Sequence, residues 1–112
     1  MGKANIERVS PKNGAHDMSL DYVELRKAAL VLRAVNHKLR QKMLDLLGEN
    51  NHMTVTEIYV KLRLEQSVAS QHLAILRSAG VVKTERNGKF IYYSVNRSRV
   101  GQIFSLVEEL AA

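Results

Sequence analysis

The apolar positions of this chain form a series of helical stripes, interrupted late in the sequence by one pair of short strands. The first helix is predicted over residues 21–35, where Asp21 and Glu24 have the spacing of a capping box. Its apolar stripe repeats at intervals of three and four residues and consists of Tyr22, Leu25, Ala29 and Leu32. The chain therefore opens its folded part with an amphipathic helix.

Two shorter helices are expected next. One begins after Asn36 as its cap and stops at Gly48, and its inward residues are Leu39, Met43, Leu46 and Leu47. Residues 49–53 are predicted to form a loop. The other helix opens at Thr54 with Glu57 as its capping-box partner, and it buries Ile58 and Leu62.

A fourth helix is predicted from Glu65 or Gln66 to Ser78, closed by Gly80 in a left-handed conformation. At 100° per residue its inward face consists of Ala69, His72, Leu73 and Leu76. The opposite face is made of small, hydroxyl and amide side chains and contains no acid: Ser67, Ser70, Gln71, Ala74 and Ser78.

A β-hairpin and a last helix complete the pattern. Residues 81–84 and 90–95 are predicted strands, with Asn87 and Gly88 at the centre of a type I′ turn between Arg86 and Lys89. Ser98 is expected to cap the C-terminal helix, whose apolar stripe is Val100, Ile103, Phe104, Val107 and Leu110. The fold class is mainly α with a small β-hairpin, which is the arrangement of a winged helix-turn-helix.

The length of 112 residues indicates one small domain. Residues 1–18 are polar, include the single proline, and are interpreted as a flexible N-terminal tail; residues 19–112 form the domain. Such a domain has little core left for both terminal helices, so their apolar stripes predict a dimer interface. The alternative is that both helices pack within the chain.

Charge and composition narrow the class of protein. The net charge is +6, and residues 36–99 carry 11 basic against 5 acidic residues, so the excess lies where the helices and hairpin would meet a polyanion. No apolar run reaches the ~20 residues of a membrane span and no signal peptide is seen, so we expect a cytoplasmic protein without membrane contact. The absence of cysteine excludes disulfides and thiolate metal sites.

Residues 67–82, SVASQHLAILRSAGVV, resemble the recognition-helix pattern of the ArsR/SmtB family, S-x-V-S-x-H-L-x-x-L-x-x-A-G-L-V. The basic hairpin ERNGKFIYYSV and the upstream segment NHKLRQKML are also similar to that family. The resemblance implies a homodimeric bacterial transcriptional repressor that binds a palindromic operator in double-stranded DNA through a winged helix-turn-helix. It implies that the first and last helices form the dimer, and it does not imply an enzyme.

The exposed residue types suit groove chemistry. Gln71 can make a bidentate pair with adenine, Ser67 and Ser70 can bond base edges or phosphate, and Gln66 adds an amide at the helix start. Arg86 and Lys89 suit flanking phosphates or the minor groove. Further backbone contacts are expected from Arg77, Lys61, Arg63 and Lys38. The alternative function is a winged helix used as a protein-interaction module without sequence-specific DNA binding, for which an acidic or apolar outward face is expected.

The sensory sites usual in the family are not found in this sequence. The start of the third helix has no cysteine, and Arg97, Ser98 and Arg99 occupy positions where the family's other site places zinc ligands. The histidines His16, His37, His52 and His72 lie in different elements without ligand spacing, and His72 is interpreted as a structural residue. We expect no metal and no cofactor; the alternative is an atypical histidine site assembled across the dimer. An organic ligand, a protein inducer or no inducer all stay open.

Overall fold

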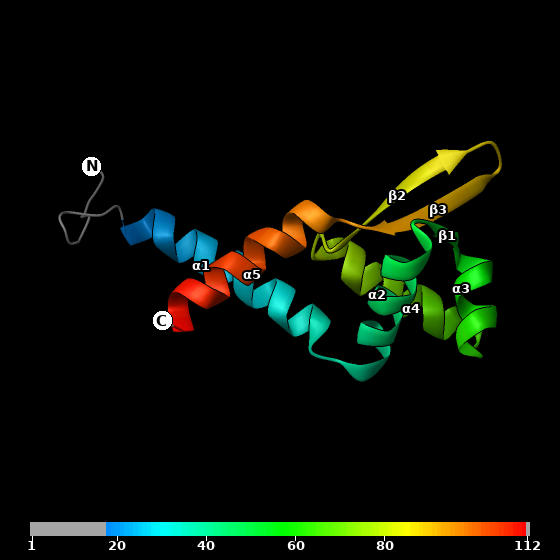
Figure 1. Cartoon of the computed structure of the whole chain (residues 1–112), viewed down its shortest axis with the longest axis horizontal. Coiled ribbons are helices and arrows are strands. Elements are labelled where there is room, and N and C mark those ends of the chain that lie inside the picture. Colours follow the sequence, from blue (N-terminus) through cyan, green and yellow to red (C-terminus); the bar gives the residue numbers. More distant parts are fainter. Residues whose placement is uncertain (1–17, 112) are drawn as a thin grey trace. The chain divides into compact units, whose positions relative to one another are not determined.

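A computed structural model describes residues 18–111, with side chains described for residues 22–109. The proposed tail, residues 1–18, lies almost wholly outside the described residues. The chain divides into two units, residues 1–30 and Val31–Ala112. The second unit contains the last turn of the first helix and every later element (Figure 1). It also holds the hydrophobic core. No helix among the described residues is long and apolar enough to cross a membrane.

Helix α1 spans Met18–Val35, so its start precedes the predicted capping residue Asp21, which lies inside the helix. The predicted apolar stripe is not buried within the chain, because Tyr22, Leu25 and Leu32 are exposed. In the last turns of α1 it is Val31 and Ala34, on the neighbouring face, that are buried in the core cluster.

Helix α2 spans Lys38–Asn50 and buries three of its four predicted inward residues, Met43, Leu46 and Leu47. The predicted cap Asn36 is wrong: the N-cap is His37, whose Nδ1 accepts a hydrogen bond from the Leu39 backbone N–H at 3.1 Å. The predicted stop at Gly48 is wrong as well. Helical hydrogen bonding continues past this glycine, at a cost of ~1 kcal/mol relative to alanine.

The predicted loop 49–53 is shorter than expected, because Met53–Thr54 forms strand β1. Helix α3, Val55–Leu62, begins at the predicted cap: Thr54 accepts from the Glu57 backbone N–H at 3.2 Å, and the Glu57 carboxylate accepts from the Thr54 N–H at 2.9 Å. This reciprocal pair is the predicted capping box. Arg63 ends the helix at a positive φ of 58°.

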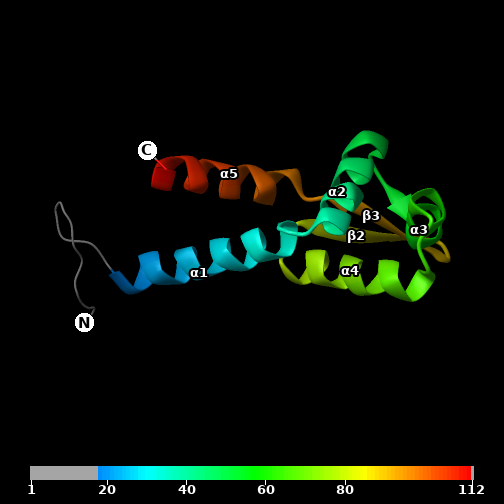
Figure 2. The ribbon, with the colours of Figure 1, turned by 90° about the horizontal axis from the view of Figure 1, so that it is seen from below.

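Helix α4 spans Gln66–Ser78, as predicted, and Gly80 follows it at a φ of +78°. Ala69, Leu73 and Leu76 are fully buried, which confirms the predicted inward face. Helices α2, α3 and α4 contact one another around these residues (Figure 2). The core formed here fixes the direction in which the polar face of α4 points.

Strands β2, Val82–Asn87, and β3, Phe90–Val95, form the predicted hairpin, and β1 pairs with the other edge of β3 in an antiparallel sheet of order β1-β3-β2. Asn87 pairs with Phe90, so the loop consists of Gly88 and Lys89. Gly88 has a φ of 64°, and Asn87 is not among the described residues with positive φ. The type I′ prediction is therefore wrong: positive φ at the first loop residue alone is typical of type II′.

Helix α5 spans Arg97–Ala111. Its predicted cap Ser98 is wrong, because the Asn96 side-chain oxygen accepts from the Arg99 backbone N–H at 3.3 Å. Asn96 also donates to the Gly80 carbonyl oxygen at 3.1 Å and so joins the start of α5 to the end of α4. Within the predicted stripe Val100, Ile103 and Val107 are partly buried and Phe104 is exposed, and the Leu110 side chain lies outside the described residues.

Candidate nucleic-acid interface

The face of α4 that points away from the core carries polar side chains, because the opposite face of the helix packs into the core. Gln66, Ser67, Ser70 and Gln71 are all exposed. Within the part of the chain that the structure describes, their side chains make no hydrogen bond to protein. They stand at the N-terminal half of the helix, where unpaired backbone N–H groups favour an anion.

The hairpin provides the basic members of the predicted set. Arg86 and Lys89 are exposed on either side of Gly88, and Lys89 Nζ lies 5.5 Å from the centroid of the Phe90 ring. The hairpin tip and the N-terminal end of α4 lie at the same end of the second unit (Figures 1 and 2). The structure thus brings the predicted amide, hydroxyl and basic groups to one end of this unit.

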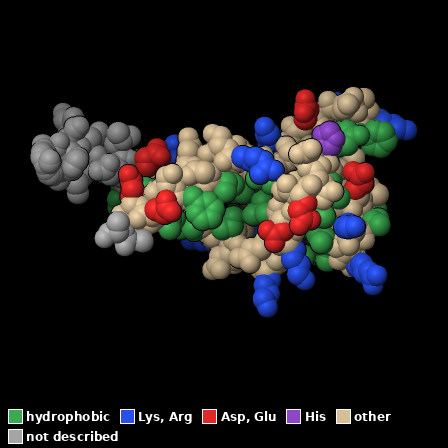
Figure 3. Space-filling model, viewed as in Figure 1, with side chains coloured by type: hydrophobic (Ala, Val, Ile, Leu, Met, Phe, Trp, Pro, Cys, Tyr) green, Lys and Arg blue, Asp and Glu red, His purple; other side chains and the backbone are tan. Residues whose placement is uncertain are grey.

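The remaining predicted basic residues are also exposed: Arg77, Lys61, Arg63 and Lys38. Among the described residues none of the four forms an ion pair, since the one salt bridge there joins Lys27 to Glu24. Figure 3 shows Lys and Arg side chains around the part of the molecule that holds α2, α3, α4 and the hairpin. Because they are exposed and unpaired among the described residues, the positive charges of these four side chains are available to bind a polyanion.

Sequence reasoning missed a buried arginine behind the α4 face. Arg40 is 9% exposed, and its guanidinium donates to the carbonyl oxygens of Arg33 and Ala34 at the end of α1. Its Nη1 lies 3.1 Å from Nδ1 of His72 on α4. Carbonyls at a helix C-terminus carry partial negative charge, which explains how a cation is tolerated here without an acidic partner.

His37 completes this cluster, with its ring centroid 4.8 Å from that of His72. Burial lowers the pKa of His72 below its ordinary value, and the neighbouring His37 and Arg40 lower it further. His72 is half-buried and bonded, as its structural interpretation predicted. The convergence of residues 37, 40 and 72 could not be read from their spacing, because it depends on how α2 packs against α4.

A metal site is not formed by the described residues, where no group of three or more histidine, cysteine or acidic side chains converges. His37 and His72 are near each other, but the guanidinium of Arg40 lies against His72. A cation in that place would meet a fixed positive charge. The cluster therefore suits a structural role.

Comparison with known proteins gives the family. The family profile described as bacterial regulatory protein, arsR family, matches residues 37–84. The uncharacterized HTH-type transcriptional regulator MJ1325 of Methanocaldococcus jannaschii is 39% identical over 84 residues, covering 75% of this chain and 94% of that protein. The transcriptional repressor PagR of Bacillus anthracis is 35% identical over 94 residues, covering 84% of this chain and 94% of PagR.

Solved structures agree with this relationship. The crystal structure of PagR superposes with a TM-score of 0.65 at 37% identity, covering 76% of this chain and 98% of that one. The homodimeric winged helix-turn-helix DNA-binding domain Mb0332 of Mycobacterium bovis superposes with a TM-score of 0.68 at 30% identity, covering 81% and 83% of the two chains. The chain therefore belongs to the ArsR family of winged helix-turn-helix proteins and is a DNA-binding transcriptional regulator, not an enzyme.

Proposed function

We propose that the protein is a homodimeric repressor that reads a palindromic operator with α4 in the major groove and the hairpin against the flanking backbone. The observation that carries the proposal is the outward face of α4, which is exposed, polar and free of acids. The relatives PagR, a repressor, and Mb0332, a homodimer, support the same assignment by similarity. The proposed place of action is the cytoplasm.

Gln71 is the proposed base reader. It lies at the centre of the exposed face, and its amide can donate and accept together against the major-groove edge of adenine. Ser67 and Ser70 lie beside it and can bond base edges or phosphate, while Gln66 lies in the first turn, near the phosphate-attracting helix end. Sequence preference is therefore assigned to a few side chains of one helix.

The basic residues are the proposed backbone contacts. Arg86 and Lys89 at the hairpin tip, together with Arg77 at the far end of α4, would neutralise phosphates irrespective of sequence. Each neutralised phosphate releases counterions, so operator affinity should fall steeply with salt. A winged helix that binds proteins instead of DNA would not show this steep salt dependence of duplex binding.

The dimer is proposed to form through the terminal helices. Phe104 on α5 is 67% exposed and Tyr22 on α1 is 66% exposed. Exposed apolar side chains of this size often mark a protein–protein interface, so we assign them to the contact with the second protomer. A two-fold axis through these helices would place two copies of α4 about one helical turn of DNA apart. Palindromic sites follow from that symmetry.

The testing experiment is operator selection from random duplexes, followed by anisotropy titrations on the selected operator and on a scrambled duplex. Gln71→Ala should weaken operator binding by about 1–3 kcal/mol and leave the scrambled duplex nearly unchanged. Arg86→Ala should weaken both duplexes alike. Gln102→Ala and Lys42→Ala, exposed residues of α5 and α2, are the matched controls.

Three outcomes would contradict the proposal. A selection that enriches no palindrome would remove the symmetric dimer on DNA. Equal losses on both duplexes for Gln71→Ala would remove its base-reading role. Binding that does not change with salt would favour the protein-interaction module.

A further inference from the structure

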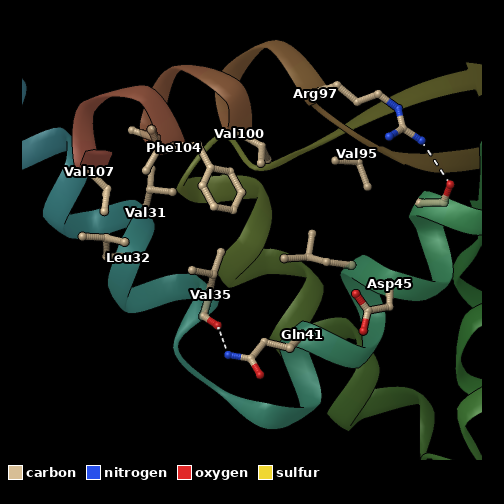
Figure 4. A pocket seen from close by; sticks show the side chains of 13 residues that line it. Val31, Leu32, Val35, Gln41, Asp45, Val95, Arg97, Val100, Phe104 and Val107 are labelled. Atoms are coloured by element: carbon tan, nitrogen blue, oxygen red, sulfur yellow. Dashed lines mark hydrogen bonds between the residues drawn. The ribbon is translucent and has the colours of Figure 1, made fainter. Parts of the chain in front are cut away.

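The apolar hollow between the end of α1, helix α2 and helix α5 belongs to the surface that the proposed dimer covers. Val35 of α1 and Val100 and Phe104 of α5 face its interior (Figure 4). Its rim carries both a cation and an anion, Arg97 and Asp45. Because residues of the terminal helices form its walls, the second protomer is its proposed occupant. The exposed apolar side chains of α4 have no such assignment.

Ala74 and Ile75 are the exposed apolar side chains of α4. Ile75 is 43% exposed and Ala74 is exposed as well, whereas the other apolar residues of this helix are buried or half-buried. We call this pair the apolar step. It follows Gln71 by three and four residues, so it lies one helical turn further along the face that carries Gln71. An apolar surface therefore stands beside the proposed base reader.

The core fixes the direction in which the apolar step points. Leu73 and Leu76, which flank the step along the chain, have no exposed surface. A rotation of α4 that covered the step would bring one of these leucines into water, and the loss of buried apolar surface opposes that rotation. The step therefore stays on the face that the proposed function turns towards DNA.

The polar side chains around the step restrict which bases this face can read. Between Gln66 and Leu76 there is no Arg, Lys, Asp or Glu. The nearest acid in sequence, Glu65, precedes the helix as its N-cap. Arg and Lys are the usual partners of guanine, and carboxylates accept from cytosine, whereas the amide of Gln71 suits adenine. The face is therefore better suited to A·T pairs than to G·C pairs.

The major groove offers one apolar group, the C5-methyl of thymine. The other base edges carry donors and acceptors, which lose hydrogen bonds to water when an alkyl side chain covers them. Against a thymine methyl the apolar step instead removes apolar surface from water on both partners. At 1.5 Å per residue, Ala74 and Ile75 lie ~4.5 and ~6 Å beyond Gln71 along the helix axis, which corresponds to one or two base-pair steps of ~3.4 Å.

We propose that the apolar step is a specificity-determining contact that reads the C5-methyl group of a thymine one or two base pairs from the pair read by Gln71. The proposal rests on the proposed function, since it specifies which bases the same face of α4 selects. The alternative is that Ala74 and Ile75 support the helix without touching a base.

The test replaces the thymines of the selected operator by uracil, one position at a time and in both half-sites. Uracil lacks the methyl group and keeps every hydrogen-bonding group of thymine. At one position the affinity of the wild-type protein should fall about fourfold per half-site, the value of burying one methylene-sized group. Equal affinity for all the uracil operators would overturn the proposal.

A protein variant then assigns the contact to the apolar step. Ala74→Ser combined with Ile75→Ser should bind the thymine and uracil operators equally, because the apolar surface is gone. Val60→Ser, which changes a 64% exposed apolar residue of α3, is the matched control and should keep the fourfold difference. Circular dichroism checks folding, and the uracil series on the wild type needs no variant. A folded double variant that still distinguishes thymine from uracil would overturn the assignment.

The two proposals fail in different ways. If the protein selects no operator, the proposed function is wrong and the apolar step has no base to read. If it selects a palindrome whose thymines can all be replaced by uracil without loss of affinity, the proposed function stands and the apolar step is not a base reader. A half-site without thymine within two base pairs of the adenine read by Gln71 would have the same meaning.

Discussion

The α4–hairpin region and the region around α5 show opposite relations between surface and core. In α4 the side chains of Ala69, Leu73 and Leu76 are wholly buried, and the face opposite them is mostly polar, although Ile75 is 43% exposed. In α5 the apolar stripe is partly buried at Val100 and Ile103, and Phe104 remains 67% exposed. The hairpin also exposes Phe90 and Ile91, at 49% and 45%, so the contrast lies between the two helices: α4 buries both of its leucine side chains in the core, whereas α5 leaves its only aromatic side chain for another molecule to cover.

The largest expected effect is the difference in stability between truncating a buried apolar side chain of α4 and truncating an exposed one of α5. Leu73→Ala should lower the free energy of unfolding by about 2–5 kcal/mol, because it leaves a cavity in the core. Phe104→Ala should cost much less in the isolated protomer. Urea titrations at low protein concentration measure both; equal losses would show that α5 packs as tightly as α4.

The connection between the two regions provides the next test. Gly80 has a φ of +78°, and a Cβ built on it would lie 3.2 Å from Nε of Arg99. Gly80→Ala should therefore lower the free energy of unfolding by at least about 1–2 kcal/mol, the cost of a left-handed non-glycine residue. Gly101→Ala, where an added Cβ meets nothing within 4 Å, is the control. A neutral Gly80→Ala would argue against the left-handed close of α4.

The residues that cap α3 and α5 give a smaller difference in stability. Thr54→Ala removes one half of the α3 capping box and should cost about 1 kcal/mol in chemical unfolding. Ser98→Ala should be nearly neutral, because Asn96 caps α5. If Ser98→Ala instead matched the loss from Thr54→Ala, the assigned start of α5 would be wrong.

The smallest effect concerns pH. The pKa of His72 is lowered in the folded state by burial, and further by the His37 ring and the Arg40 guanidinium that face it. The unfolded chain therefore takes up the proton first, so stability present above about pH 6.5 is lost as the pH falls below it. Unfolding midpoints from pH 7.5 to 5 measure this loss. His72→Gln should flatten the profile relative to wild type, and an unchanged slope would contradict the assignment.

Local rules predicted the parts of the fold that local chemistry controls. Thr54 with Glu57, Gly80 after α4 and the two faces of α4 were all identified, because each depends on neighbours within about one helical turn. The residues proposed to touch DNA were found exposed for the same reason.

Errors arose where tertiary packing chooses between locally equivalent options. Asn36 and His37 can both cap α2, and the fold uses His37. The hairpin register pairs Asn87 with Phe90, which moves the turn by one residue.

The sequence by itself determined the resemblance to the family, the order of the helices and the hairpin, and the polar face of α4, since these follow from residue types and short spacings. The tertiary structure alone decided that Arg40, His37 and His72 meet, and that a hollow lies between α1, α2 and α5. Residues 32 positions apart become neighbours only when helices pack, and a cavity is a property of imperfect packing. Neither can be read from a periodic pattern along one chain.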